Sequence, residues 1–115
     1  MTTLAPLRGE VWMTEFNPVR GHEQAGRRPA LIVSVDDFNR SPAGLAVVLP
    51  ITSKRKNIAS HVAVVPPEGG LTRPSYIKCE DVRSVSTERL SARLGRVSAA
   101  TLVKVEDWLR ILLRL

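Results

Sequence analysis

The chain has 115 residues, and its content of 43% hydrophobic and 24% charged residues argues against a disordered or fibrous protein. Seventeen Lys and Arg residues outweigh eleven Asp and Glu residues, and the net charge of +6 favours a polyanionic partner, nucleic acid before an anionic membrane. A lone cysteine, two distant histidines and the lack of a long apolar segment argue against a disulfide, a metal site, a signal peptide and a membrane-spanning helix. We therefore expect one domain over residues 1–115, without a cofactor, in the reducing cytoplasm.

Apolar runs separated by turn residues predict a small, curled antiparallel sheet with one helix packed on it. The helix is expected at the C-terminus, because Ser98 is a good N-cap and apolar residues recur after it at helical spacing. In chain order the predicted elements are a strand at 11–16, a long loop at 17–28, a strand at 30–35, one helical turn at 36–42, a strand at 45–51, a basic loop at 52–60, a strand at 61–65, a turn at 66–70, a long strand at 76–85, a short strand at 90–97 and a helix at 99–115.

Three features refine this outline. Pro50 cannot donate to a β-ladder, so we expect it at a strand end or on an edge strand. The apolar alternation of the long strand slips near Asp81, which favours a β-bulge there. The terminal helix is apolar beyond one stripe, so either its own sheet alone covers it, the simpler arrangement, or its sheet and a second subunit do.

The junction between the long loop and the strand at 30–35 is the first candidate site. Pro29 biases Arg28 away from the helical region and towards extended backbone, so Arg28 should stand at the rim of a strand. A guanidinium held there suits the binding of an anion. The alternative is a loop in which Arg27 and Arg28 are simply solvated.

Two further groups of charged residues could likewise either serve a site or lie on the surface without a function. The cations at 54–56 form the densest positive cluster of the chain, and they either bind a polyanion or form a solvated tip that discourages edge-to-edge aggregation. Glu80 and Asp81 lie at the predicted slip of the long strand. These acids either face a site or pair with Arg83 or Arg73 on the surface.

Several short segments, taken in order along the chain, carry a family resemblance. The segments are Arg8-Gly9-Glu10-Val11-Trp12, Asn17-Pro18-Val19, the run 21–33 that contains Gly26-Arg27-Arg28-Pro29, Pro50-Ile51-Thr52-Ser53, the run 75–85, Arg89-Leu90 and Leu94-Gly95-Arg96-Val97. Together they resemble the MazF/PemK family of toxins over nearly all of residues 8–115. No single segment is a strict signature, but their order makes the combination specific.

The resemblance implies a fold, an activity and a set of partners. The fold would be a small, SH3-like twisted antiparallel barrel with a C-terminal helix, an α+β fold, assembled as a homodimer. The activity would be that of a type II toxin, a metal-independent and sequence-specific endoribonuclease (mRNA interferase) that cleaves single-stranded RNA. The partners would be that RNA and a cognate MazE-type antitoxin covering the RNA groove, with no membrane involved.

The resemblance also assigns residues. In this family an arginine in the Gly-x-Arg-Pro segment and a threonine after the third strand form the catalytic pair, and they match Arg28 and Thr52. The loops 17–27 and 53–61 would line the RNA groove. Because aromatic residues make up only 4% of the chain, base stacking would fall to arginine planes, Phe16 or Pro18. The residues expected to bind RNA are Asn17, Pro18, Arg20, Glu23, Gln24, Arg27, Ser53, Lys54, Arg55, Lys56, Asn57, Glu80 and Asp81.

Cleavage without a metal requires the substrate's own 2′-OH to attack the neighbouring phosphate, which leaves 2′,3′-cyclic phosphate and 5′-OH ends. Arg28 would donate to the phosphate oxygens as negative charge builds on them, and Thr52 would hold the phosphate or the 2′-OH in line. Arginine is a poor base, and His22 and His61 are the conventional candidates for proton transfer, a role that the family pattern leaves open.

Two other functions fit the same fold or composition. A CcdB-like toxin of the same broad superfamily poisons DNA gyrase, and here that activity would rest on the helix end at 108–115. A non-catalytic RNA-binding module or inactivated toxin is the other alternative. The presence of both Arg28 and Thr52 favours the ribonuclease.

Overall fold

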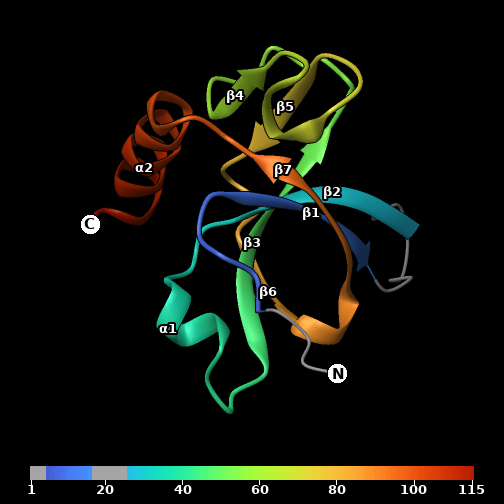
Figure 1. Cartoon of the computed structure of the whole chain (residues 1–115). Coiled ribbons are helices and arrows are strands. Elements are labelled where there is room, and N and C mark those ends of the chain that lie inside the picture. The colour runs from blue at the N-terminus through green and yellow to red at the C-terminus, as the bar shows by residue number, and fades with distance from the viewer. Residues whose placement is uncertain (1–4, 17–25) are drawn as a thin grey trace.

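The computed structural model describes residues 5–16 and 26–115, in which short antiparallel strands dominate and a long helix follows at the C-terminus (Figure 1). The predicted fold, mainly β with a C-terminal helix, is confirmed. The elements are β1 (Glu10–Phe16), β2 (Gly26–Ile32), α1 (Asp36–Asn39), β3 (Leu45–Thr52), β4 (His61–Val64), the 3-10 turn η1 (Glu68–Gly70), β5 (Ser75–Lys78), β6 (Arg83–Ser86), the 3-10 turn η2 (Thr87–Arg89), β7 (Leu90–Arg96) and α2 (Ala99–Leu113).

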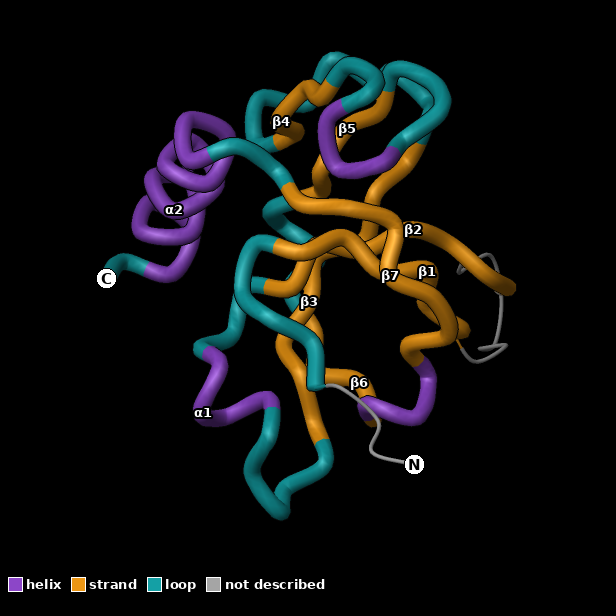
Figure 2. The backbone as a smooth tube through the Cα atoms, viewed as in Figure 1, coloured by secondary structure: helices purple, strands orange, loops and turns teal. Residues whose placement is uncertain are grey.

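The sheet is centred on β3. The strands follow the order β4-β5-β3-β2-β1-β7, and β6 joins β3 off that path. β3 pairs with β2 and β6 over its first part and with β5 at its end, at Ile51 and Thr52. All these pairs are antiparallel, and the backbone in Figure 2 curls so that β4 and β5 stand to one side of β1, β2 and β7.

Both faces of the central strands are covered. Successive residues of a strand point to opposite faces, so Leu31 and Leu49 enter one apolar cluster, to which α2 contributes Val105. Ala30 and Val48 enter a second cluster on the other face. Because neither face of β2 and β3 is fully solvated, these strands are apolar at successive positions, which explains the continuous apolar runs in the sequence.

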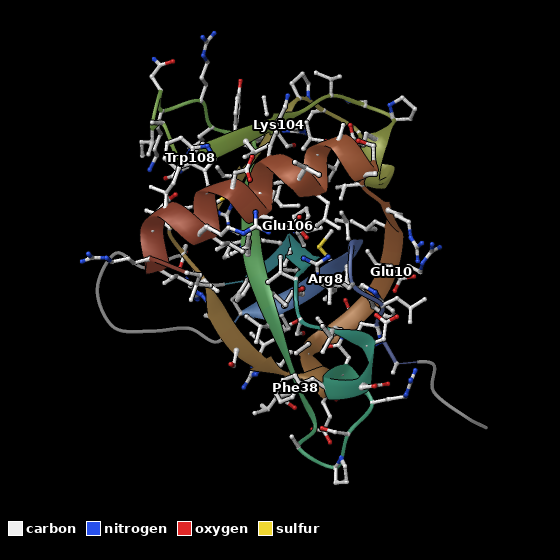
Figure 3. All side chains as sticks on the ribbon, turned by 90° about the vertical axis from the view of Figure 1, so that its left-hand side faces the viewer. Arg8, Glu10, Phe38, Lys104, Glu106 and Trp108 are labelled. Carbon is white, nitrogen blue, oxygen red and sulfur yellow. The ribbon has the colours of Figure 1, made fainter. Side chains whose placement is uncertain are left out.

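Helix α2 begins where the sequence predicts and is held by side chains from three other segments. The Ser98 Oγ accepts the N–H of Thr101 at 3.2 Å, as predicted for an N-cap. The Glu68 carboxylate of η1 accepts the N–H of Ser98 at 2.9 Å and the hydroxyl of Thr101 at 2.5 Å. Further along, Arg8 forms a 2.6 Å ion pair with Glu106 (Figure 3). The far side of the helix, including Ile111, is exposed.

The predicted bounds of the second strand are wrong at both ends. β2 runs over Gly26–Ile32, not over 30–35, and its register with β1 extends from Leu31 back to Gly26. Pairing of backbone groups does not require apolar side chains, so the polar residues before Pro29 still form a strand. Arg28 therefore lies within a paired strand, opposite Thr14, and not at its first position.

The predicted long strand at 76–85 is two strands. Ile77 of β5 lies opposite Ile51, whereas Arg83 of β6 lies opposite Val48, so the chain between them is longer than the stretch of β3 that it spans. The slip expected near Asp81 is present, but it is a turn between two strands and not a one-residue bulge.

Pro50 lies inside β3, which differs from the expected strand end or edge. It is opposite Ala30, in the last pair that β3 makes with β2 before β3 turns to β5. The missing N–H thus falls where β3 changes its partner, and a proline is tolerated there because an uninterrupted ladder is not required.

Two glycines allow η1 to cross directly over β7. A Cβ atom at Gly70 would lie 1.9 Å from the carbonyl oxygen of Leu94, and a Cβ atom at Gly95 would lie 2.6 Å from the nitrogen of Gly70. Gly70 also has a φ of 70°, which favours glycine. The crossing fixes the start of the segment 71–75, which approaches β2 and β3.

Three further properties bear on function. No helix of the described chain is long and apolar enough to cross a membrane. Within residues 5–16 and 26–115, no group of three or more His, Cys, Asp and Glu side chains is placed to hold a metal ion. Cys79 is buried, and burial, with a smaller contribution from the charge of Glu80, raises the pKa of its thiol to about 12, so the thiol is not a candidate nucleophile.

Candidate active site between two diverging strands

β2 and β3 run side by side and then separate. Their last shared pair joins Ala30 to Pro50. Beyond it, β2 stays beside β1 as far as Gly26, whereas β3 turns to β5 and pairs there through Thr52. Figure 1 shows the resulting divergence between β2 and the part of the sheet that contains β4 and β5. We call the space between residues 27–29 of β2 and 51–53 of β3 the fork.

The predicted catalytic pair lies on the two arms of the fork. Arg28 lies two residues before Ala30 on β2, and Thr52 lies two residues after Pro50 on β3, so the two residues stand on separated strands, where Arg28 pairs with Thr14 and Thr52 with Tyr76. Because side chains alternate along a strand, both residues belong to the face of the sheet that carries Ala30 and Pro50. Residues separated by 24 positions in the sequence thus lie on either side of the point where β2 and β3 separate, although Thr52 is not among the residues that line the pocket described below.

Arg28 and Arg27 have different surroundings. Arg28 is partly buried, and its Nε atom is buried without a hydrogen-bond partner among the described residues. The exposed Arg27 donates through Nη2 to Ser91 Oγ at 2.9 Å, and its Nε lies 3.9 Å from a Glu15 carboxylate oxygen. A buried N–H without a partner costs about 1–3 kcal/mol, so Arg28 is the arginine that gains most from an incoming acceptor.

Thr52 is buried and oriented by the chain that follows it. Its relative exposure is 5%, and its Oγ1 atom accepts the N–H of Lys54 at 3.1 Å. This bond turns the backbone at the end of β3 and still leaves the hydroxyl proton of Thr52 available to a further acceptor.

The basic loop at 53–60 begins with seven exposed residues, 53–59. Asn57 adopts a left-handed conformation with φ of 54°, and its Oδ1 atom accepts from Arg55 Nε at 3.0 Å. No carboxylate in the described part of the chain forms an ion pair with Lys54 or Lys56. The predicted positive cluster is therefore a solvated surface beside the fork.

The far end of the basic loop is attached to Glu80. Its carboxylate accepts from Ser60 Oγ at 2.6 Å and lies 2.7 Å from His61 Nε2. Although burial alone would raise the pKa of Glu80, the hydrogen bonds from Ser60, its own backbone and His61 lower it. The His61 side chain is only 3% exposed, which does not suit a general base that must reach a 2′-OH.

Asp81 and Phe16 are placed differently from the expectation for residues that contact bases. Asp81 forms a two-oxygen ion pair with Arg83 at 2.8 Å and a 3.4 Å pair with Lys78, so the pairing of this acid with Arg83 is confirmed. Phe16 is 4% exposed, and the Arg83 guanidinium lies 5.0 Å from its ring centre. Phe16 therefore offers no open stacking surface. Base contacts by Glu80 and Asp81 remain predictions.

The fork opens into a pocket of about 360 Å³. Its lining combines an apolar floor with guanidinium and hydroxyl groups, and no carboxylate residue of the described chain is part of it. The lining residues are Met13, Arg27, Arg28, Pro29, Ile51, Ser53, Leu71, Thr72, Arg73 and Ser75. Sequence reasoning considered Arg73 only as a partner for an acid, because no local pattern reveals that the segment 71–75 closes the fork.

Part of the predicted site cannot be placed. The residues of the first loop that were expected to act on RNA lie outside the described residues. They are Asn17, Pro18, Arg20, His22, Glu23 and Gln24.

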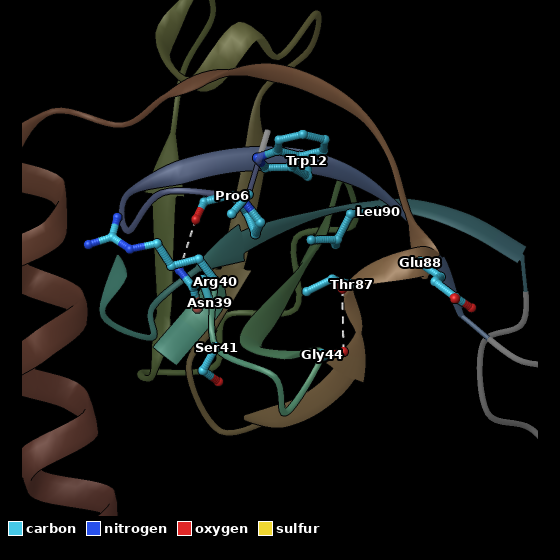
Figure 4. A pocket seen from close by; sticks show the side chains of 10 residues that line it. Pro6, Trp12, Asn39, Arg40, Ser41, Gly44, Thr87, Glu88 and Leu90 are labelled. Carbon is cyan, nitrogen blue, oxygen red and sulfur yellow. Dashed lines mark hydrogen bonds between the residues drawn. The ribbon is translucent and has the colours of Figure 1, made fainter. Parts of the chain in front are cut away.

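A larger pocket, of about 390 Å³, lies elsewhere in the molecule (Figure 4). Trp12, Leu90 and Pro6 line it, together with Asn39 and the start of the turn after β6. None of the residues predicted to act on RNA lines this pocket. Volume alone therefore does not identify the site, and the fork is the better candidate because it joins a cationic lining to a buried Arg28 Nε that has no partner among the described residues.

The chain is similar to known proteins over nearly its whole length. A family model described as "PemK-like, MazF-like toxin of type II toxin-antitoxin system" matches residues 7–113. The endoribonuclease MazF9 of Mycobacterium tuberculosis is 38% identical over 112 residues, which cover 90% of this chain and 92% of MazF9. A crystal structure of MazF from Deinococcus radiodurans matches with a TM-score of 0.84 and 31% identity, covering 98% of this chain and 100% of that one. A MazE–MazF structure from D. radiodurans matches with a TM-score of 0.82 and 31% identity, covering 98% and 99% of the two chains.

Proposed function

Because the chain belongs to the PemK-like, MazF-like family of toxins of type II toxin–antitoxin systems, we propose that it cleaves single-stranded RNA at the fork between β2 and β3. The protein is a toxin with endoribonuclease activity. Its proposed mechanism is metal-independent: the 2′-OH of the substrate attacks the adjacent phosphorus, the bond to the 5′ oxygen of the next nucleotide breaks, and the products carry a 2′,3′-cyclic phosphate and a 5′-OH.

In this mechanism Arg28 stabilises the negative charge that builds on the non-bridging oxygens of the phosphate. A guanidinium on a paired strand is already oriented, so little reorganisation is needed when the charge appears. Thr52 holds the phosphate or the 2′-OH in line for attack. The observation that carries the proposal is the Nε atom of Arg28, which is buried without a hydrogen-bond partner among residues 5–16 and 26–115, at a fork whose pocket is lined by no acidic residue of that part of the chain.

The proposed partners are those of a type II toxin. We infer a MazE-type antitoxin, which is supported by the similarity to the MazE–MazF structure, and a location in the cytoplasm, where mRNA is available. We also infer a homodimer, because α2 exposes apolar residues such as Ile111 and Leu113, at 67% and 50%. The gyrase alternative would use this same helix end, but the named endoribonucleases among the relatives favour RNA.

The decisive experiment is an RNA cleavage assay in EDTA. A long transcript of mixed sequence, incubated with the protein, should give discrete fragments whose 5′ ends accept phosphate from polynucleotide kinase without prior phosphatase treatment. Mass spectrometry should detect a 2′,3′-cyclic phosphate at their 3′ ends. A requirement for Mg²⁺, or fragments with 5′-phosphate ends, would contradict the mechanism. RNA that is bound but not cut would instead support the non-catalytic module.

A further inference from the structure

Arg73 lies on a firmly held segment but keeps an exposed side chain. Leu71, two residues before it, is 7% exposed and belongs to the apolar cluster below α2. Ser75, two residues after it, is 4% exposed, and its hydroxyl donates to the Arg73 carbonyl oxygen at 2.9 Å. The crossing at Gly70 fixes the start of the same segment. The backbone of Arg73 is thus ordered before any ligand arrives, which lowers the entropic cost of binding.

The charges around Arg73 favour an anion. The fork pocket is lined by Arg27, Arg28 and Arg73 together with the hydroxyls of Ser53 and Thr72. Six arginines of the described chain form ion pairs with carboxylates, and Arg28 and Arg73 are not among them. The paired arginines are Arg8, Arg27, Arg40, Arg83, Arg93 and Arg110.

Arg73 and Arg28 line one pocket but come from different segments of the chain. Arg28 and Thr52 share the face of Ala30 and Pro50. The floor of the pocket comes from the other face, because Ile51 and Leu71 belong to the cluster below α2. An RNA strand bound at both places would pass across the end of the sheet, between the separated β2 and β3.

We propose that Arg73, assisted by the hydroxyls of Ser53 and Thr72, binds a second phosphate of the RNA, next to the one that is cleaved. This inference rests on the proposed ribonuclease function and extends it by a substrate subsite. Arg73 contributes to binding the strand and not to the chemical step, since its exposed side chain extends from the segment 71–75 and not from the two strands that carry Arg28 and Thr52. Its loss therefore raises KM and leaves kcat nearly unchanged.

The test compares Arg73→Ala and Arg73→Lys with Arg40→Ala. Arg40 is paired with Asp37 at α1, so its removal gives the same change in net charge far from the fork. We expect Arg73→Ala to raise KM roughly tenfold, as for one charge-assisted hydrogen bond. The slope of log affinity against log salt should fall by about 0.7, the value for one phosphate of a single strand. Arg73→Lys should retain the salt slope, and Arg40→Ala should match wild type.

Binding of a 2′-O-methyl RNA pool of randomised sequence, measured by fluorescence anisotropy in the same variants, separates this inference from the proposed function. Such RNA has no attacking 2′-OH, so the salt slope reports on the subsite whether or not ordinary RNA is cut. Wild type that binds the pool but fails to cleave RNA in EDTA contradicts the mechanism alone. The subsite is overturned if Arg73→Ala has the same KM and the same salt slope as Arg40→Ala. It is also overturned if Arg73→Ala lowers kcat while KM stays constant. Unchanged thermal melting confirms that the variants fold.

Discussion

The fork and the basic loop at 53–60 both present positive charge, but they hold it in different ways. In the fork, Arg28 sits on a strand paired with β1, its Nε is buried, and Arg73 extends from a segment fixed at both sides. In the basic loop, Lys54 and Lys56 project from exposed backbone into solvent. The loop has the higher density of charge, whereas the fork has the better defined geometry.

This difference separates two parts of ribonuclease function. Solvated lysines attract phosphates over a distance and are screened by salt, so they govern the capture of RNA. An oriented and partly desolvated guanidinium acts on charge that exists only in the transition state, so it governs the rate of cleavage. Substitutions of the proposed catalytic pair, Arg28 and Thr52, should thus lower kcat, and substitutions in the loop should raise KM.

The largest effect is expected for Arg28→Ala. Removal of one preorganised donor to a developing oxyanion typically costs 100- to 1000-fold in rate, so kcat should fall by about that factor. Arg27→Ala is the matched control, because Arg27 is adjacent in sequence but already bonded to Ser91. Single-turnover cleavage of a labelled transcript measures both variants. Equal losses would remove the distinction between the two arginines.

Thr52→Val should follow, with a fall in kcat of roughly 10- to 100-fold. The substitution keeps the volume of the buried side chain but removes the hydroxyl that bonds Lys54 and is proposed to align the substrate. Thr52→Ser, which retains a hydroxyl, is expected to keep most of the activity. If valine and serine at this position behave alike in the same assay, the hydroxyl has no part in the reaction.

The basic loop should show the opposite pattern. Combined replacement of Lys54, Arg55 and Lys56 by alanine is expected to raise KM roughly tenfold, because exposed charges contribute little each. The salt slope should fall by about 2, the value for three phosphates of a single strand. Anisotropy titrations over a range of salt concentrations measure this slope.

The control for this triple variant removes the same charge elsewhere, by combined replacement of Lys104, Arg110 and Arg114 on and after α2. A fall in kcat in the loop variant, with KM unchanged, would contradict the division between the loop and the fork.

The smallest effect is expected for Glu80→Gln, which weakens the attachment of the loop. The folded-state pKa of Glu80 is lower than its ordinary value of 4.5, so its contribution to stability is present above that value and disappears as the pH falls through the folded-state pKa. The melting temperature of wild type should therefore fall slightly below about pH 4.5. Glu80→Gln has no carboxylate at this position at any pH, so its melting temperature should not show this fall. Identical pH profiles would show that the contacts to Ser60 and His61 do not stabilise the fold.

Local patterns in the sequence predict the strands of the core and the cap of α2 well, because burial and capping act on neighbouring residues. They do not predict the start of β2, since Gly26 to Arg28 look like a loop until β1 supplies backbone partners. They also merge β5 and β6, whose separation arises from the register that each forms with β3.

The candidate site was likewise predictable where local sequence determines it and unpredictable where contacts between distant segments do. Arg28 could be singled out because Pro29 restricts its backbone, but its relation to Thr52 came only from the family resemblance. Arg73 was missed as a site residue, because its position depends on the crossing of Gly70 over β7 and on the divergence of β3 from β2. Both are contacts between distant segments, and no short stretch of sequence encodes them.

The buried Cys79 offers a way to separate the role of the basic loop from that of the fork. With one thiol in the whole sequence, and with that thiol's pKa raised to about 12 by burial, the native protein should resist maleimide reagents at neutral pH. A substitution such as Lys56→Cys would then create one reactive position on the basic loop without removal of the native cysteine. A fluorophore attached there would report the arrival of RNA at the loop separately from its cleavage in the fork, so that capture and reaction could be timed on one molecule.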